Sequence, residues 1–189
     1  MPNPSATGAV VLVALSVLYP ALVYALKSVI PPQVFTGLAL LLIGLRVATL
    51  GSEATRIWRG PLISAGILIS GLATIDGWIA AKIYPVALSL AAAYAFGISL
   101  WRPPSLIERF ARIGEPDLPA AGQNYCRIVT MIWTVWLAVN AAIAALLAIL
   151  ASEEAWALWT GLLAYLIMGI LFGGEMLLRP RRRSPASRA

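Results

Sequence analysis

Three ionisable side chains fall inside apolar stretches of the sequence, where a charge is unfavourable and marks a candidate functional site. They are Arg46, Asp76 and Glu175. Asp76 lies deepest, and Lys82, six residues later, is not its neighbour on a helix face. Asp76 is therefore the best candidate for a substrate or proton site, with a polar contact to another helix as the alternative. Arg46 can extend to the cytoplasmic surface, and Glu175 can pair with Arg179 one turn later.

A second candidate site lies in the longest apolar stretch. Trp133, Trp136 and Asn140 recur at i, i+3 and i+7, so a helix places them on one face. An Asn at bilayer depth usually forms a hydrogen bond to another helix. We therefore expect a packing seam, with a ligand cavity lined by the two Trp side chains as the alternative.

A short amphipathic segment, residues 104–113, precedes this stretch. Leu106 and Phe110 recur at i and i+4, and prolines and a glycine mark the ends of the segment. Such a helix lies in the membrane interface with its apolar side down. Arg109 and Arg112 then contact anionic headgroups or a cytoplasmic partner. The alternative is a surface helix that only sets the spacing of its neighbours.

Several aromatic residues, among them Trp58, Tyr84, Trp101 and Trp156, fall near the ends of apolar stretches. This position is typical of the aromatic belt at headgroup level. Stacking against a ligand is the alternative interpretation.

The residue inventory excludes several kinds of catalysis. The chain has no His and one Cys, Cys126, so neither a Ser–His–Asp triad nor a thiolate metal cluster can form within it. No Gly-rich phosphate loop follows a strand pattern. We expect no metal and no cofactor. Any catalysis would rest on carboxylates, Arg, Tyr or Ser, so an enzyme is not the favoured class.

The composition is that of a membrane protein. The chain is 60% hydrophobic and 12% charged, whereas soluble domains are about 25% charged. We expect one all-α domain over residues 1–178 and a basic, disordered tail over 179–189. The net charge of +6 comes from arginines beside apolar stretches, which argues against nucleic acid as a partner.

Six stretches approach the roughly 20 apolar residues that a transmembrane helix needs. The expected spans are 7–26, 33–50, 61–81, 84–101, 125–151 and 154–178. With six spans, every arginine falls on the side of the two termini. Lys27, Lys82, Glu153 and Glu154 fall on the other side. The positive-inside rule then places both termini in the cytoplasm.

The second half of the chain carries a P-x-L-I-x-R pattern, an acidic connector with prolines, and a Trp-containing span that includes an Asn. The matching residues are Pro104, Leu106, Ile107 and Arg109, then Trp133, Val135 and Asn140. This pattern resembles the YciB, or intracellular septation protein A, family. It also resembles small membrane proteins associated with aryl polyene biosynthesis pathways. The resemblance implies a bacterial inner-membrane protein and supplies no catalytic residue.

Three functions are compatible with these features. The first is a non-enzymatic accessory or scaffold protein in septation, envelope maintenance or aryl-polyene lipid assembly. The second is a small carrier or channel-like subunit for a lipidic or small organic substrate, with Asp76 and Asn140 lining the path. The third is an enzyme acting on an acyl or isoprenoid substrate. An Asp76 that faces lipid or is capped by local backbone would count against the second.

The expected partners are membrane lipids and cytoplasmic or membrane proteins. A second copy of the chain is a further candidate, because Gly169 and Gly173 have the spacing that lets helices approach closely. Close packing within the chain is the favoured interpretation of that spacing.

Overall fold

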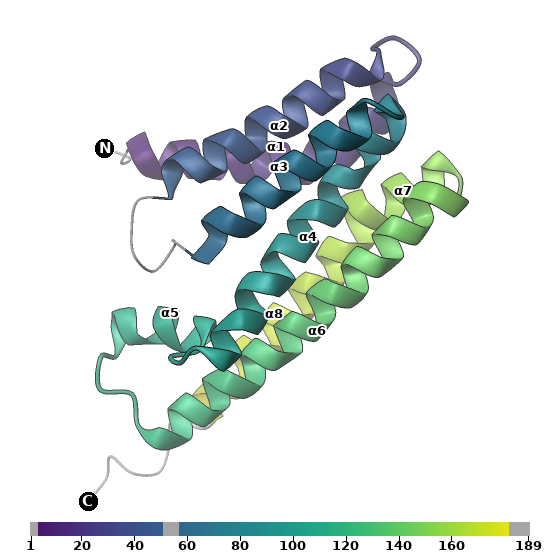
Figure 1. Ribbon diagram of the computed structural model, residues 1–189. Helices are drawn as coiled ribbons and strands as arrows, with labels where there is room; N and C mark the ends of the chain where they lie inside the picture. The colour runs from purple at the N-terminus through teal and green to yellow at the C-terminus, as the bar shows by residue number, and fades with distance from the viewer. Residues whose placement is uncertain (1–3, 51–56, 182–189) are drawn as a thin grey trace, which may run out of the picture.

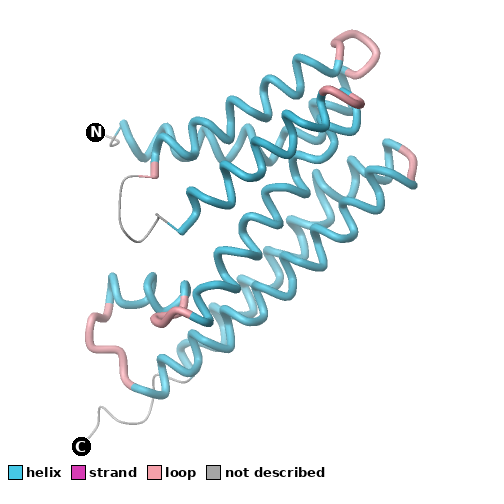
Figure 2. Tube along the Cα trace, in the orientation of Figure 1, coloured by secondary structure: helices cyan, strands magenta, loops and turns pink. Residues whose placement is uncertain are grey.

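The protein is an all-helical bundle. A computed structural model describes residues 4–50 and 57–181, and this part of the chain contains helices and short connections but no strand (Figures 1 and 2). The helices are α1 (Pro4–Leu26), α2 (Pro32–Thr49), α3 (Arg59–Ala73), α4 (Gly77–Trp101), α5 (Leu106–Gly114), α6 (Ala120–Leu150), α7 (Glu153–Leu158), the π-helix η2 (Trp159–Leu163) and α8 (Ala164–Arg181). The last three follow one another without a break.

Several of these helices are long and apolar enough to cross a membrane, which confirms the all-helical class and agrees with the predicted membrane protein. By length and composition, four stretches qualify: Pro32–Thr49, Gly77–Trp101, Ala120–Leu150 and Glu153–Leu177. Two shorter apolar helices, Val10–Leu26 and Arg59–Ala73, complete the set in the described part of the chain. The expected tail overlaps the end of α8, and its remainder, 182–189, lies outside the described residues.

The helices form two groups that meet at one end. α1, α2 and α3 make one group, and α4, α6 and the α7–η2–α8 rod make the other (Figure 1). The α1–α2, α3–α4 and α6–α7 connections lie where the groups meet, which we call the joined end. At the opposite, splayed end the two groups diverge, and α5 lies there beside α6 (Figure 1).

α4 is the central element of the bundle, since it contacts α1, α2, α3, α5 and α6. Its buried face is rich in alanine, which lets neighbouring helices approach closely. Gly97 extends this face: a Cβ there would lie 3.3 Å from Cγ2 of Thr134 on α6. The small residues of α4 therefore serve close packing against its neighbours.

The break between the third and fourth helices differs from the expected one. The predicted spans 61–81 and 84–101 meet at Lys82, but α3 ends at Ala73 and α4 begins at Gly77. The reason is the N-cap: Asp76 accepts hydrogen bonds from the backbone N–H groups of Trp78, at 2.8 Å, and Ile79, at 3.1 Å. A single Lys inside an apolar stretch does not break a helix, whereas an acid that satisfies free N–H groups starts one.

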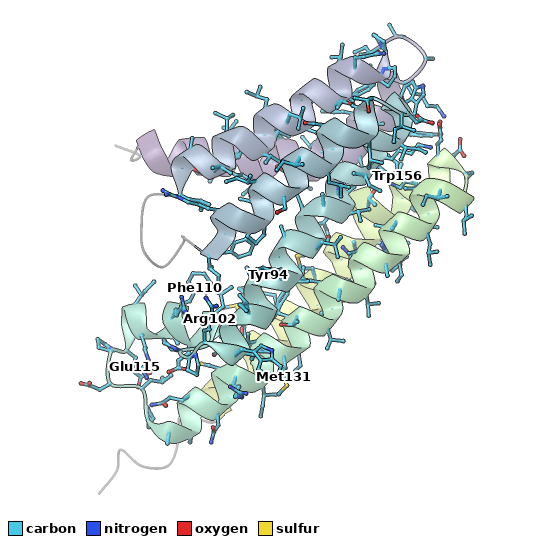
Figure 3. The ribbon with its side chains drawn as sticks, viewed as in Figure 1. Tyr94, Arg102, Phe110, Glu115, Met131 and Trp156 are labelled. Carbon is cyan, nitrogen blue, oxygen red and sulfur yellow. The ribbon has the colours of Figure 1, made fainter. Side chains whose placement is uncertain are left out.

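Charged residues divide between the two ends. At the joined end Glu153 forms ion pairs with Lys27 and with Lys82, the latter at 3.5 Å. These contacts tie α7 to the end of α1 and to α4. Arg102 and Glu115 lie near the opposite end from Trp156 (Figure 3). The grouping of Lys27, Lys82 and Glu153 at one end agrees with the predicted charge segregation.

α5 forms close to its expected position and packs one side against the bundle. On that side Leu106 is 1% exposed and Glu108 is buried, whereas Phe110 is 52% exposed. Hydroxyls from the bundle fix this orientation, since Ser99 Oγ accepts from the backbone N–H of Leu106 at 2.9 Å. Thr130 on α6 accepts similarly from the next residue. Capping by neighbouring helices, and not amphipathicity alone, therefore orients α5.

The prediction that Gly169 and Gly173 pack closely against other helices of the chain is wrong. A Cβ at either position would meet nothing within 4 Å. Neither glycine therefore allows a close approach of another described helix to α8.

Candidate functional site

A cavity of about 510 Å³ lies between the two helix groups, and we call it the interhelical cavity. Its walls include three aromatic rings: Trp58, which precedes α3, Phe96 on α4 and Trp133 on α6. The ring centroids of Trp58 and Phe96 are 6.3 Å apart, as are those of Phe96 and Trp133. The three rings thus form a continuous apolar wall that joins the two groups.

Arg46 of α2 also lines this cavity. Its Nη2 donates a hydrogen bond to Ser16 Oγ on α1 at 2.9 Å. The guanidinium therefore points into the bundle and does not extend to the surface, contrary to expectation, because Ser16 lies in the middle of α1. Its Nε is buried without a hydrogen-bond partner, and no carboxylate in the described chain forms an ion pair with it.

A second cavity, of about 170 Å³, adjoins the first and shares lining residues such as Leu88 and Leu137 with it. We call it the polar pocket. Its polar lining residues are Ser16, Tyr84, Ser89, Asn140, Thr160 and Tyr165. The Tyr84 hydroxyl donates to Ser16 Oγ at 3.0 Å. Since Ser16 also contacts Arg46, the guanidinium lies at the junction of the two cavities.

Asn140 is a packing contact between three helical segments, as the sequence predicted. Its Nδ2 donates to Ser89 Oγ on α4 at 3.0 Å, and its Oδ1 accepts from Trp159 Nε1 at 3.0 Å. Trp159 begins η2, and π-helical turns inside α-helices frequently occur at functional sites. Asn140 therefore both seals the helix interface and lines the polar pocket.

Trp136 does not share the inward face of Trp133 and Asn140. It lines a separate outer depression with Val135 and Leu171. A spacing of three residues leaves a side chain about 60° off the starting direction, whereas seven residues return it to within about 20°. Only the i, i+7 pair therefore faces the bundle interior.

Asp76 does not line either cavity. Its exposed side chain caps α4, and Ser89, the partner of Asn140, lies further along the same helix by about 20 Å at roughly 1.5 Å per residue. The structure therefore separates Asp76 from Asn140 and does not support a path lined by both. The carboxylate is also capped by local backbone, the condition that counts against its substrate or proton role.

Glu175 lies on α8, where its backbone carbonyl accepts a hydrogen bond from the Tyr125 hydroxyl at 3.5 Å. The side chain of Arg179 lies outside the described residues. The ion pair between Glu175 and Arg179 therefore stays a prediction.

Arg109 and Arg112 both make contacts within their own connector. Arg109 Nε donates to the backbone carbonyl of Pro104 at 2.9 Å, and its Nη2 to that of Arg102 at 3.2 Å. Arg112 Nη2 lies 2.7 Å from Glu108 Oε1. Their expected contact with headgroups or a partner stays a prediction, because the structure shows a local role for each.

Sequence reasoning missed the inward role of Trp58, Tyr84 and Ser16. The first two were expected in the aromatic belt, but Tyr84 is fully buried and Trp58 lines the interhelical cavity. Trp156, another expected belt residue, is 1% exposed. For Ser16 the sequence does contain an indication. It is a serine within an apolar stretch, and a buried hydroxyl needs a hydrogen-bond partner.

Comparisons with known proteins add no relative. No protein-family model matches the chain, and no curated protein or solved structure is significantly similar to it. The resemblance to the septation protein family therefore stays a prediction. No cluster of three metal-ligating side chains occurs among the described residues.

Proposed function

We propose that the protein is a non-enzymatic membrane protein that binds one lipid-like molecule between its two helix groups. The interhelical cavity carries this proposal. At about 510 Å³ it falls within the roughly 300–1,000 Å³ of sites that hold a small organic molecule. Its lining is mostly aromatic and aliphatic with one cationic group, the composition that such sites share.

This proposal selects the carrier or binding-subunit interpretation but replaces its residues. Arg46 and Trp133 take the place of Asp76 as the candidate ligand contacts, and Asn140 remains at the inner end of the site. No Asp or Glu lines either cavity in the described part of the chain. That lining does not favour a membrane enzyme, since general acid–base catalysis of acyl or isoprenoid chemistry usually employs such groups.

We further propose that α1, α2, α3, α4, α6 and the α7–η2–α8 rod all span the bacterial inner membrane, with the splayed end in the cytoplasm. The ion pairs of Glu153 with Lys27 and Lys82 gather the few lysines at the joined end, which supports this orientation. α3 has 15 residues and is about 22 Å long, short of the roughly 30 Å hydrocarbon core. Local thinning of the bilayer or snorkelling of flanking residues such as Arg59 accommodates a helix of this length.

A contact of α5 with the membrane surface or a cytoplasmic partner is a second candidate role. Phe110 is 52% exposed and Ile113 is 80% exposed, so α5 presents apolar side chains outside the bundle. This surface supports the accessory or scaffold role in septation or aryl-polyene lipid assembly. It is compatible with ligand binding in the interhelical cavity.

The test is quenching of Trp fluorescence in purified, detergent-solubilised protein. Brominated stearic acid and brominated stearyl alcohol serve as quenching probes. We expect saturable quenching by at least one of them, reversed by its unbrominated counterpart. Saturable quenching should disappear in a Trp58→Phe/Trp133→Phe variant, because these rings line the cavity.

The matched control is a Trp101→Phe/Trp136→Phe variant, which removes two Trp side chains outside the cavity. It should retain the saturable quenching. Quenching that rises linearly with probe in the micelle, without competition and equally in both variants, would show that no site exists.

A further inference from the structure

Arg46 is a half-buried cation that lacks a counter-ion among the described residues. One of its five N–H groups donates to Ser16, while its Nε is buried and unpaired. An uncompensated charge inside a bundle is destabilising unless a partner is supplied. Its position at the edge of an apolar cavity leaves room for a ligand to supply that partner.

The neighbouring hydroxyls reinforce the preference for an anion. Ser16 Oγ donates to the Leu12 carbonyl at 2.8 Å and accepts from both Arg46 and Tyr84. Ser16 Oγ is therefore fully used, and the Tyr84 hydroxyl is committed to it, so neither hydroxyl neutralises the guanidinium. The remaining N–H groups of Arg46 are the charged donors left for a negatively charged oxygen.

The charge of the site favours a carboxylate over a phosphate. One guanidinium neutralises one negative charge, and its planar fork matches the two oxygens of a carboxylate. A phosphate monoester carries about −1.5 to −2 charges at neutral pH, so Arg46 alone would leave it partly uncompensated. The cavity also has the volume of a site for one small molecule, which favours a single-chain ligand over a two-chain lipid.

From these contacts we infer that the interhelical cavity binds a single-chain carboxylate amphiphile. The carboxylate takes Arg46, and the apolar chain lies along the wall formed by Trp58, Phe96 and Trp133. The inference rests on the proposed function and specifies its ligand class.

The experiment compares brominated stearic acid with brominated stearyl alcohol in the quenching assay, at a pH where the acid is ionised. Native protein should bind the acid about ten- to a hundredfold more tightly, the effect of one charge-assisted hydrogen-bonded pair. Arg46→Met should remove this preference while it retains saturable binding of the alcohol. Retained alcohol binding shows that the variant is folded with its cavity intact.

Two further arms make the test specific. Arg127→Met removes an exposed arginine of α6 and should leave the preference unchanged, which separates the site from a general attraction of anions. Tyr84→Phe removes a hydroxyl that donates to Ser16 and does not line the interhelical cavity, so it should change the preference for the acid less than Arg46→Met does. If Arg46→Met does not fold, Arg46→Lys, which keeps the charge but not the fork, should show a reduced preference for the acid.

Distinct results overturn the inference and the proposed function. Equal binding of the acid and the alcohol, or an undiminished preference in Arg46→Met, overturns the carboxylate site but leaves a lipid-binding cavity. Tighter, Arg46-dependent binding of competing stearyl phosphate than of stearic acid overturns the choice of carboxylate. Absence of saturable quenching by either brominated probe overturns the proposed function itself.

Discussion

Trp159 donates a hydrogen bond from its indole Nε1 to Oδ1 of Asn140 at 3.0 Å and so joins the π-helical turn of the last rod to α6. Asn140 Nδ2 in turn donates a hydrogen bond to Ser89 Oγ on α4, also at 3.0 Å. Both the amide nitrogen and the amide oxygen of Asn140 therefore form hydrogen bonds to other helical segments. This arrangement holds the second helix group together beside the polar pocket.

Asn140→Leu should lower the free energy of unfolding by about 1–2 kcal/mol, since it leaves the Trp159 indole N–H and the Ser89 hydroxyl without these partners. Thermal unfolding in detergent, followed by intrinsic fluorescence, measures the loss. Asn124→Leu is the matched control, because Asn124 is an exposed residue of the same helix. Equal effects of the two substitutions would contradict the structural role of Asn140.

Asp76→Ala should destabilise the start of α4 by about 1 kcal/mol, because it removes the side-chain acceptor for two backbone N–H groups. Asp76→Asn keeps a capping oxygen and should change stability by much less. The two variants also distinguish a capping role of Asp76 from a substrate role in a carrier. In the carrier hypothesis, Asp76→Asn abolishes activity. Ligand binding in the quenching assay should survive Asp76→Asn. Loss of binding in a stable Asp76→Asn protein would restore the substrate role of this residue.

The contact between Lys27 and Glu153 should make stability depend on alkaline pH. The hydrogen bond to Glu153 raises the pKa of the Lys27 ammonium above its ordinary value of about 10.4. The contribution is therefore complete below that value and is lost as pH rises through the higher folded pKa. Lys27→Met should lower the melting temperature near neutral pH, and the difference from native protein should shrink at strongly alkaline pH. A difference that does not change with pH would exclude the ionic contribution.

Glu108→Ala should loosen α5 and expose its connector. The buried Glu108 carboxylate accepts from Arg112 at 2.7 Å and from the backbone N–H of Ser105 at 3.3 Å, so its removal breaks a cap and an ion pair together. Limited digestion with chymotrypsin should cleave after Phe110 faster than in native protein. Asp117→Ala, in the same connector, is the control and should leave the cleavage rate unchanged.

The same contacts change how a variant of Arg109 and Arg112 should be interpreted. Both side chains hold the connector together, so a double replacement should accelerate the same cleavage. A functional defect of that variant would indicate a docking partner only if Glu108→Ala, with a similarly loosened connector, retained function.

The helical class of the protein and the grouping of its charges could be predicted because both depend on local composition. Long apolar stretches can only satisfy their backbone groups in lipid as helices. Lys27, Lys82 and Glu153 could be assigned to one end by counting spans, and the structure places them together. Asn140 was predicted to join helices for the same kind of reason, since a buried amide needs partners wherever it lies.

The position of Asp76 could not be predicted from hydropathy. The apolar stretch continues on both sides of it, and only the backbone N–H groups it caps place a helix start there. Trp136 likewise diverges from Trp133 and Asn140 because the contact face of α6 is narrower than the stripe of aromatic residues. In both cases the residue pattern of one helix does not show which groups of the folded chain that helix contacts.

The sequence by itself therefore determined an all-helical protein with helices apolar enough to cross a membrane, the segregation of its lysines from its arginines, and the need of Asn140 for partners. These follow from the free energy of transferring each residue type to lipid, which needs no knowledge of distant contacts. Only the tertiary structure brought Arg46 of α2, Ser16 of α1 and Tyr84 of α4 together beside an aromatic cavity. Such a site depends on the packing of separate helices, and helix packing is set by side-chain shapes that a single segment does not record.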